Sequence, residues 1–180
     1  MSRSDARRHA FVLIYQMPFH NPMDTSTFAW LKAQYYDCLS NPLLGPRPSG
    51  RDDEYASRVM WGTHEHRVQL DAIIENFLKG WDISRINKVD LALMRLAIYE
   101  MLREPDVPYG VAVNEAVELA KAYGTDESPA FINGVLGNAA REMSQYSERS
   151  ENIPEGFAIK KHPREPLKFP TNTAQGAGRG

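Results

Sequence analysis

The sequence has little of what marks secreted, membrane-spanning or strongly charged proteins. Its 180 residues include one cysteine, Cys38, which excludes a disulfide framework and any metal site built from several cysteines. No apolar run approaches the roughly 18 residues needed to cross a bilayer. The N-terminus also lacks the apolar segment of a signal peptide. A cytoplasmic protein is therefore expected, and its net charge of only −2 does not by itself indicate a nucleic-acid partner.

Motifs for catalysis and metal binding are scarce as well. The sequence contains no glycine-rich phosphate-binding loop. His64 and His66 flank Glu65, but residues two apart on a helix do not share a face, and the zincin pattern needs histidines four apart. No group of side chains forms a catalytic constellation. We therefore expect a protein that is not an enzyme, with no cofactor and no metal.

Helical periodicity, in contrast, is present in almost every segment up to about residue 150. The apolar spacing predicts helices over residues 4–17, 25–39, 52–80, 87–102, 109–123 and 128–143. The segment 87–102 is apolar on nearly every side, which is typical of a central helix packed all round. The predicted fold class is all-α, a compact bundle of about six or seven helices.

Composition divides the chain into two parts. Residues 1–150 carry the periodic segments, whereas residues 151–180 are rich in Pro, Gly and Lys. This contrast predicts one helical domain followed by a flexible basic C-terminal tail, which either solubilises the protein or contacts RNA nonspecifically. A loop is also predicted over residues 40–50, because its three prolines and two glycines cannot continue a helix.

Charge is concentrated at the start of the first helix. Residues 1–150 hold 16 Lys and Arg against 20 Asp and Glu, yet Arg3, Arg7 and Arg8 begin this helix with Asp5 as their only acid. A cation at a helix N-terminus costs about 0.3–1 kcal/mol, so folding alone would not select three arginines there. A bound anion would explain them. The alternative is that they only solvate a helix end.

An aromatic residue follows these arginines at helical spacing. Tyr15 lies seven residues after Arg8, which places both side chains on one face of the helix. Arginine beside an aromatic ring suits single-stranded nucleic acid, because the cation neutralises phosphate and the ring stacks on bases. The spacing also permits Tyr15 to belong to the core, and both interpretations remain open.

The segment "SPAFINGVLGNAA" (128–140) places two glycines inside a predicted helix. Gly134 and Gly137 each cost about 0.8–1.0 kcal/mol relative to alanine, so we expect another backbone, from a helix or a polymer, to come close. Tight packing between helices would explain the glycines equally well. It would not explain Asn133, which offers donors and an acceptor beside them, and Phe131 lies in the first turn of the same helix.

Three stretches of the sequence are similar to the NusB family of bacterial transcription antitermination factors. The final helical pair of the family resembles "DVPYGVAVNEAVELAKAYGTDESPAFINGVLGNAA" (106–140). The helix before that pair looks like "RINKVDLALMRLAIYEML" (85–102), and the family's opening helix looks like "ARRHAFVLIYQM" (6–17). The resemblance spans about residues 3–145.

The resemblance implies a helical fold of two three-helix halves. It also implies binding to the single-stranded boxA element of ribosomal RNA leader transcripts. The family binds this RNA as a heterodimer with NusE, a ribosomal protein, in the RNA polymerase elongation complex with other Nus factors. The anion that would explain the arginines is then RNA phosphate.

The resemblance also implies roles for individual residues. RNA contacts are implied for Arg3, Arg7, Arg8, Tyr15, Phe131 and Asn133. Contacts with the NusE partner are implied for Asp90 and for Glu127, and an acidic body suits a basic ribosomal protein.

The sequence departs from the family where cations are concerned. Asp5 interrupts the basic segment, and Gly110 and Ala130 stand where many members carry lysine. Gly137 stands where many carry aspartate. Fewer cations should weaken RNA affinity. Each lost phosphate contact should also reduce the slope of log affinity against log salt by about 0.7.

Two alternative functions remain open. The chain could be an accessory module of RNA methylation, or a structural protein that forms homodimers.

Overall fold

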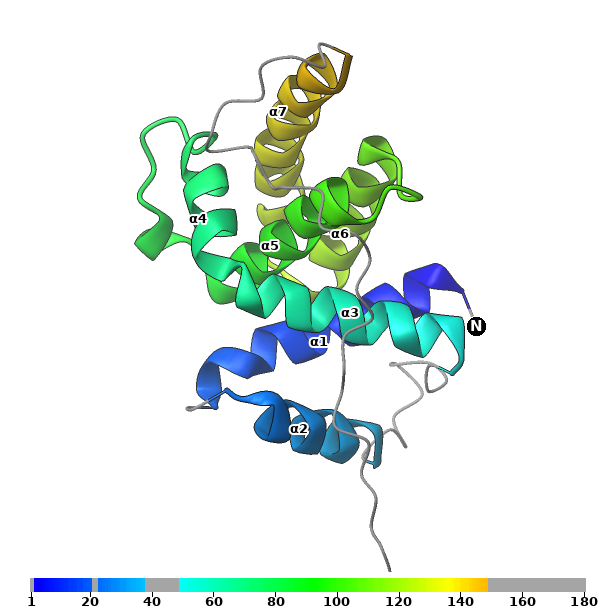
Figure 1. Cartoon of the computed structure of the whole chain (residues 1–180). Helices are drawn as coiled ribbons and strands as arrows, with labels where there is room; N and C mark the ends of the chain where they lie inside the picture. The colour runs from blue at the N-terminus through cyan, green and yellow to red at the C-terminus, as the bar shows by residue number, and fades with distance from the viewer. Residues whose placement is uncertain (1, 21–22, 38–48, 149–180) are drawn as a thin grey trace, which may run out of the picture.

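A computed structural model of the chain describes residues 2–20, 23–37 and 49–148. These residues form seven α-helices and two short 3-10 helices (Figure 1). In chain order they are α1 (Arg3–Gln16), η1 (Met17–Phe19), α2 (Thr25–Asp37), α3 (Arg51–Glu65), α4 (Arg67–Glu75), η3 (Ile83–Arg85), α5 (Lys88–Arg103), α6 (Tyr109–Tyr123) and α7 (Ser128–Glu148). The all-α prediction is confirmed. Most of the predicted 40–50 loop, the domain boundary at 150 and the tail lie outside the described residues.

Helix α1 begins with a capping box that the sequence analysis did not identify. The Ser2 hydroxyl oxygen accepts from the amide of Asp5 at 3.2 Å, and the Asp5 carboxylate accepts from the Ser2 amide at 3.1 Å. These reciprocal bonds satisfy donors that the first helical turn leaves free, and they hold the pKa of Asp5 below its usual value. Asp5 therefore stabilises the helix start. At the other end, α1 stops before Pro18, and the chain continues as the short 3-10 helix η1.

The prediction of a single long helix over residues 52–80 is wrong, because the helix is interrupted at His66. That residue has φ −98° and ψ 13°, and it separates α3 from α4. Its imidazole Nδ1 lies 2.9 Å from the Gly62 carbonyl oxygen, which also accepts the His66 amide at 3.0 Å. The predicted apolar face continues across the break, since Val59 on α3 and Leu70 on α4 are both fully buried.

Helix α5 is the centre of the molecule, as its all-round apolar pattern predicts. It packs against α1, α3, α4, α6 and α7 (Figure 1). The consecutive residues Ala92, Leu93 and Met94, which point about 100° apart around the helix, are all buried. Where α3 lies against α5, a Cβ atom added to Gly62 would overlap the ring of Tyr99, so glycine permits the close approach of these two helices.

The remaining helices form two groups around α5. Helices α1 and α3 pack on each other with α2 against α1, and α6 pairs with α7. Helix α4 lies between the groups and contacts α3 and α5. None of the described helices combines the length and apolar character needed to cross a membrane. The fold thereby places the start of α1 beside α3, α5 and α6, and this arrangement determines what its arginines can contact.

Candidate nucleic-acid interface

Arg7 does not face solvent, so the expectation that it is presented to RNA is wrong. Its side chain is only 2% exposed. The guanidinium Nε donates to both carboxylate oxygens of Glu100, at 3.1 and 2.8 Å, and Nη2 donates to one of them at 2.8 Å. Nη1 lies 3.0 Å from a carboxylate oxygen of Glu115. Arg7 is thus an internal cation between α1, α5 and α6.

Further polar groups complete this buried cluster, which we call the Arg7 network (Arg7, Tyr55, Glu100 and Glu115, with Ser4 at its edge). Tyr55 on α3 donates its phenol hydrogen to Glu100, and the Ser4 hydroxyl donates to Glu115 at 2.8 Å. Burial lowers the pKa of Arg7, but the hydrogen bonds and charge of Glu100 outweigh it, so the pKa is raised overall. Burial, together with Glu100, raises the pKa of Tyr55. The network joins four helices through charge-assisted hydrogen bonds.

Arg3 and Arg8 also have acidic neighbours but remain partly accessible. The guanidinium of Arg8 donates to the Asp5 carboxylate at 3.1 Å, and its side chain is 29% exposed. Arg3 lies over the ring of Tyr55, 4.2 Å from the centroid, with its Nε 3.8 Å from Asp52 and its side chain 47% exposed. Folding therefore accounts for all three arginines without a bound anion. Only Arg3 and Arg8 can reach a ligand.

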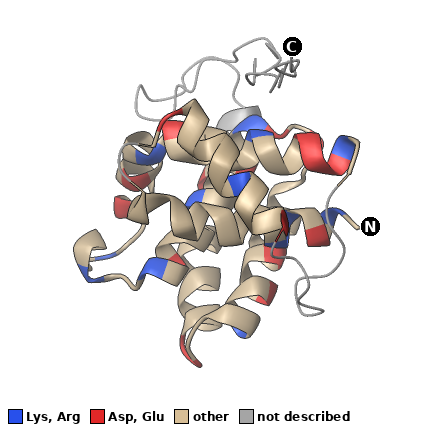
Figure 2. Ribbon diagram, turned by 90° about the horizontal axis from the view of Figure 1, so that it is seen from below, with Lys and Arg blue, Asp and Glu red and all other residues tan. Residues whose placement is uncertain are grey.

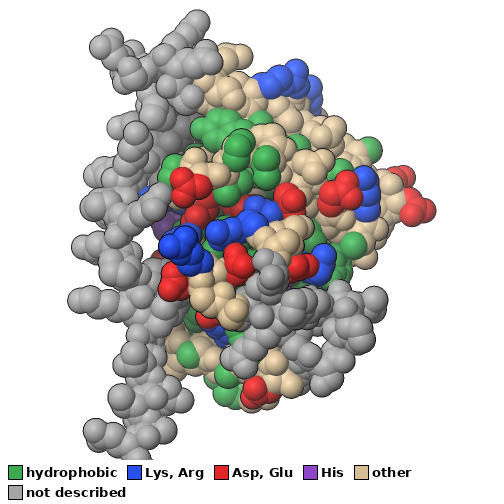
Figure 3. All heavy atoms as spheres, turned by 90° about the vertical axis from the view of Figure 1, so that its right-hand side faces the viewer, with side chains coloured by type: hydrophobic (Ala, Val, Ile, Leu, Met, Phe, Trp, Pro, Cys, Tyr) green, Lys and Arg blue, Asp and Glu red, His purple; other side chains and the backbone are tan. Residues whose placement is uncertain are grey.

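The charges at this end of the molecule are mixed rather than uniformly basic. Figure 3 views the side on which the N-terminus lies, and its Lys and Arg side chains are interleaved with Asp and Glu. Figure 2 likewise shows basic and acidic residues on most helices, with no large region of one sign. A ligand recognised here would meet individual cations rather than a broad positive surface.

Tyr15 lies between the two interpretations that its spacing allowed. Its side chain is half-buried and packs against the core. Its ring also meets the exposed ring of Phe19 edge-to-face, with the centroids 5.7 Å apart. Part of the Tyr15 ring thus belongs to the core, and part lies beside an exposed aromatic residue.

Phe131 has an aromatic neighbour that the sequence analysis missed. The ring of Trp81 lies 6.2 Å from the ring of Phe131, and Trp81 is 62% exposed. Phe131 itself is half-buried on the core. The signal in the sequence was a tryptophan within a polar segment just after a helix end, where no core position requires so large a side chain.

The neighbours of Phe131 on α7 do not all share its face. Asn133 is exposed, but it follows Phe131 by two residues and therefore points in a different direction. Gly134 and Gly137 have open space beside them, since no described atom lies within 4 Å of a Cβ added at either. Close packing between described helices therefore does not explain these two glycines.

Asp90 is not the surface acid that the resemblance implied. It is 4% exposed and lies in the first turn of α5. The Asn87 side chain accepts from the Asp90 amide at 2.8 Å and donates to its carboxylate at 2.7 Å. The other carboxylate oxygen, Oδ1, is buried and has no hydrogen-bond partner among the described residues, so contact between Asp90 and NusE stays a prediction, although not one through an exposed side chain. Glu127, in contrast, is exposed just before α7.

The described residues offer no evident place for a metal ion. Within residues 2–20, 23–37 and 49–148, no three His, Cys, Asp or Glu side chains are grouped to hold one. In the His64–Glu65–His66 motif, the imidazole Nδ1 of His66 is already within hydrogen-bond distance of the Gly62 carbonyl oxygen. Of the residues predicted to bind RNA, those with at least partly exposed side chains are Arg3, Arg8, Tyr15, Phe131 and Asn133.

Comparison with known proteins gives consistent matches. Residues 4–141 match the NusB family. The transcription antitermination protein NusB of Acetivibrio thermocellus is 40% identical over 152 residues, covering 84% of this chain and 97% of the relative. The solved structure of T. maritima NusB has a TM-score of 0.65 and 31% identity, and the match covers 79% of this chain and 92% of that one.

A second solved structure contains NusE, the protein partner that the family resemblance implied, but its RNA is double-stranded, whereas the resemblance implied a single strand. It is a complex of the antitermination factors NusB and NusE with dsRNA. Its matching chain has a TM-score of 0.63 and 22% identity, covering 78% of this chain and 96% of that one. At 22% identity, the similarity to this structure supports the fold alone.

Proposed function

The chain belongs to the NusB family of transcription antitermination proteins, and from this premise we propose that it binds single-stranded boxA RNA together with the ribosomal protein NusE. Proteins of this family are non-enzymatic, so the chain acts by binding. The proposed setting is the RNA polymerase elongation complex in the cytoplasm, on ribosomal RNA leader transcripts. The observation that carries the proposal is the family match over residues 4–141, which spans nearly all the described helices.

Arg3 and Arg8 are the proposed phosphate contacts. Both side chains are partly exposed, and their ion pairs with Asp52 and Asp5 lie at the surface. Exposed pairs of this kind contribute about 0–1 kcal/mol, so an RNA phosphate can take the place of the carboxylate at little cost. Arg7 is excluded from direct contact by its burial, and its role is to hold α1 against α5 and α6.

Aromatic contacts are proposed at Tyr15 and Phe131, each of which is half-buried and therefore held in place before RNA arrives. A preorganised ring suits base stacking, which contributes about 1–3 kcal/mol per base. Asn133 is a proposed polar contact from the neighbouring face of α7. Glu127 is exposed and remains the proposed contact with NusE, a basic partner for an acidic surface.

The test is fluorescence anisotropy with a labelled boxA RNA, with and without NusE. We expect weak binding by the chain alone and tighter binding with NusE present. The double variant Arg3→Gln/Arg8→Gln should weaken RNA binding and reduce the slope of log affinity against log salt by about 1.4, since each phosphate contact contributes about 0.7.

The matched control is Arg67→Gln, because Arg67 is an exposed cation on α4, an element that contains none of the proposed contacts. This variant should bind boxA RNA as the wild type does. Equal affinity and equal salt slopes for the wild type and the double variant would rule out the proposed contacts. Absence of boxA binding in the presence of NusE would rule out the function.

A further inference from the structure

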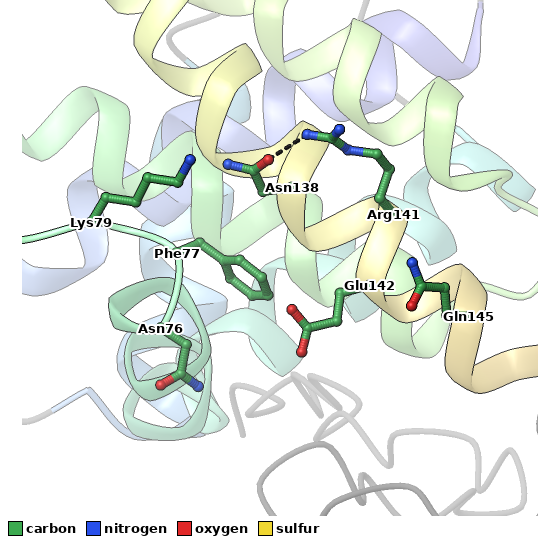
Figure 4. A pocket seen from close by; sticks show the side chains of 7 residues that line it. All are labelled: Asn76, Phe77, Lys79, Asn138, Arg141, Glu142 and Gln145. Atoms are coloured by element: carbon green, nitrogen blue, oxygen red, sulfur yellow. Dashed lines mark hydrogen bonds between the residues drawn. The ribbon is translucent and has the colours of Figure 1, made fainter.

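A polar trough lies between α7 and the turn that follows α4. It has a volume of about 480 Å³. Figure 4 shows side chains from both walls facing this space. We call it the α7 trough, lined by Asn76, Phe77, Lys79, Asn138, Arg141, Glu142 and Gln145.

The trough lies on the same face of α7 as Phe131. Positions three or four apart on a helix share a face, and Phe131 is followed at such spacings by Gly134, Asn138, Arg141 and Gln145. Along this stripe the rise from Phe131 to Arg141 is about 15 Å. The stripe therefore begins at the ring of Phe131, passes the open position at Gly134 and enters the trough.

The second wall is set by the same turn that positions Trp81. Lys79 adopts φ 41° and Gly80 adopts φ 87°, both in the left-handed region. Lys79 lies two residues before Trp81, and Figure 4 shows its side chain extending toward α7. One short turn thus supplies both an exposed ring beside Phe131 and a cation at the trough.

The two cations of the trough are not neutralised as the α1 arginines are. The Arg141 guanidinium donates to the Asn138 amide oxygen and, at 3.2 Å, to the Gly137 carbonyl oxygen, and both partners are uncharged. Among the described residues, no carboxylate lies within 4.0 Å of the charged nitrogens of Lys79 or Arg141. Glu142 is the acid in the lining, which leaves one positive charge in excess.

These features together match the chemistry of a single-stranded polynucleotide. Exposed aromatic rings stack on bases, cations bind phosphates, and amide side chains such as Asn76 and Gln145 offer both donors and acceptors. A position without a side chain, at Gly134, allows a strand to lie close to the helix between the ring and the cations. A protein surface would require an apolar centre, which a lining of one phenylalanine and six polar residues does not provide.

We propose that nucleotides flanking the boxA element bind along α7, with one base on Trp81 and a phosphate between Lys79 and Arg141. This inference rests on the proposed function, because Phe131 is where the two binding regions meet. It extends the RNA contact beyond the residues that the family resemblance implied.

The experiment compares three RNAs, a boxA core and the same core extended by four nucleotides on either its 5′ or its 3′ side. Binding is measured with the full chain in the presence of NusE. We expect one extension to raise affinity about tenfold. The variant Lys79→Gln/Arg141→Gln should lose that gain while binding the core RNA as the wild type does, and Arg67→Gln should keep the gain.

Trp81 is tested separately, because stacking on a base requires an aromatic ring and no charge. Trp81→Phe should retain most of the gain from the extended RNA, whereas Trp81→Ala should lose it. Circular dichroism checks that each variant remains folded.

Three results separate this inference from the proposed function. A wild type that binds the core but gains nothing from either extension overturns the trough alone. An equal loss of core and extended RNA in the Lys79→Gln/Arg141→Gln variant also overturns it. Failure of the wild type to bind the core overturns both proposals.

Discussion

The two basic regions of the molecule differ in what surrounds their cations. At the start of α1, each arginine has a carboxylate partner, and Arg7 has two, Glu100 and Glu115. At the α7 trough, Arg141 bonds only uncharged oxygens among the described residues. The basic residues at the start of α1 are conspicuous in the sequence, yet their charges are neutralised more completely than those of the α7 trough. A cluster of basic residues indicates available charge only when its tertiary neighbours are known.

The largest expected effect comes from breaking the Arg7 network. Arg7→Ala leaves the buried Glu100 without its main partner, which should destabilise the fold by about 3–5 kcal/mol. Urea unfolding followed by circular dichroism measures the change. Glu100→Gln should have an effect of similar size, because it leaves Arg7 with Glu115 alone. A loss below 1 kcal/mol in both variants would contradict the buried pairing.

A double replacement sharpens this prediction. Arg7→Met with Glu100→Leu removes both fully buried charges at once, and Glu115, which also loses Arg7, is partly exposed to solvent. The double variant should therefore be more stable than either single variant, because replacing a buried pair by apolar residues is often neutral or stabilising. Additive losses in the double variant would show that the two side chains act independently.

The next effect is a loss of stability at alkaline pH. Burial raises the pKa of Tyr55 and of Tyr35 in the folded state above the usual value of about 10. Stability from each phenol is therefore complete below pH 10. As the pH rises above 10 toward the folded pKa, that stability falls by up to roughly 1.4 kcal/mol per pH unit for each tyrosine.

Thermal unfolding between pH 8 and 11.5 measures this dependence. Tyr35→Phe removes one of the two phenols and should give a shallower decline above pH 10 than the wild type shows. Tyr55→Phe should do the same. Both variants should also lower stability at pH 8, because Tyr55 loses its hydrogen bond to Glu100 and Tyr35 loses its hydrogen bond with His9. A decline equally steep in all three proteins would exclude these phenols as its source.

A smaller effect of opposite sign is expected on α7. Gly134→Ala should stabilise the protein by about 0.8–1.0 kcal/mol, since alanine favours the helix and the added Cβ meets open space. The same variant should weaken binding of the extended RNA if a strand lies against this helix. Destabilisation in urea would show that the space is filled in solution.

The smallest effect on stability is expected for Arg8→Gln. Its ion pair with Asp5 is partly exposed and local to one helical turn, so the loss should be about 0–1 kcal/mol. Anisotropy with boxA RNA should nevertheless register the change. A loss of more than 2 kcal/mol would place Arg8 in the same class as Arg7 and remove the distinction between them.

The sequence predicted those features that depend on local pattern. The apolar residues of 87–102 identified the central helix, and the bounds predicted for 109–123 agree with α6. The break at His66 was not predictable, because no glycine or proline interrupts the pattern there. The burial of Arg7 was equally hidden, since Glu100 lies 93 residues away and no local rule connects the two.

The candidate site was predicted only in part, for the same physical reason. Phe131 and the exposed arginines could be identified from the family resemblance. Asp90 could not be recognised as buried, because an acid in the first turn of a helix serves equally well as a cap or as a surface charge. Lys79 and Trp81 come together with Phe131 and Arg141 of α7 only through the packing of a turn against that helix.

The separation of Arg7 and Glu100 along the chain also affects biosynthesis. A ribosome adds roughly 5–20 residues per second, so the 93 positions between them take on the order of 5–20 s to translate. During that interval the nascent first helix carries a cation whose final partner does not yet exist. The Arg7 network can therefore be completed only after the central helix has been synthesised.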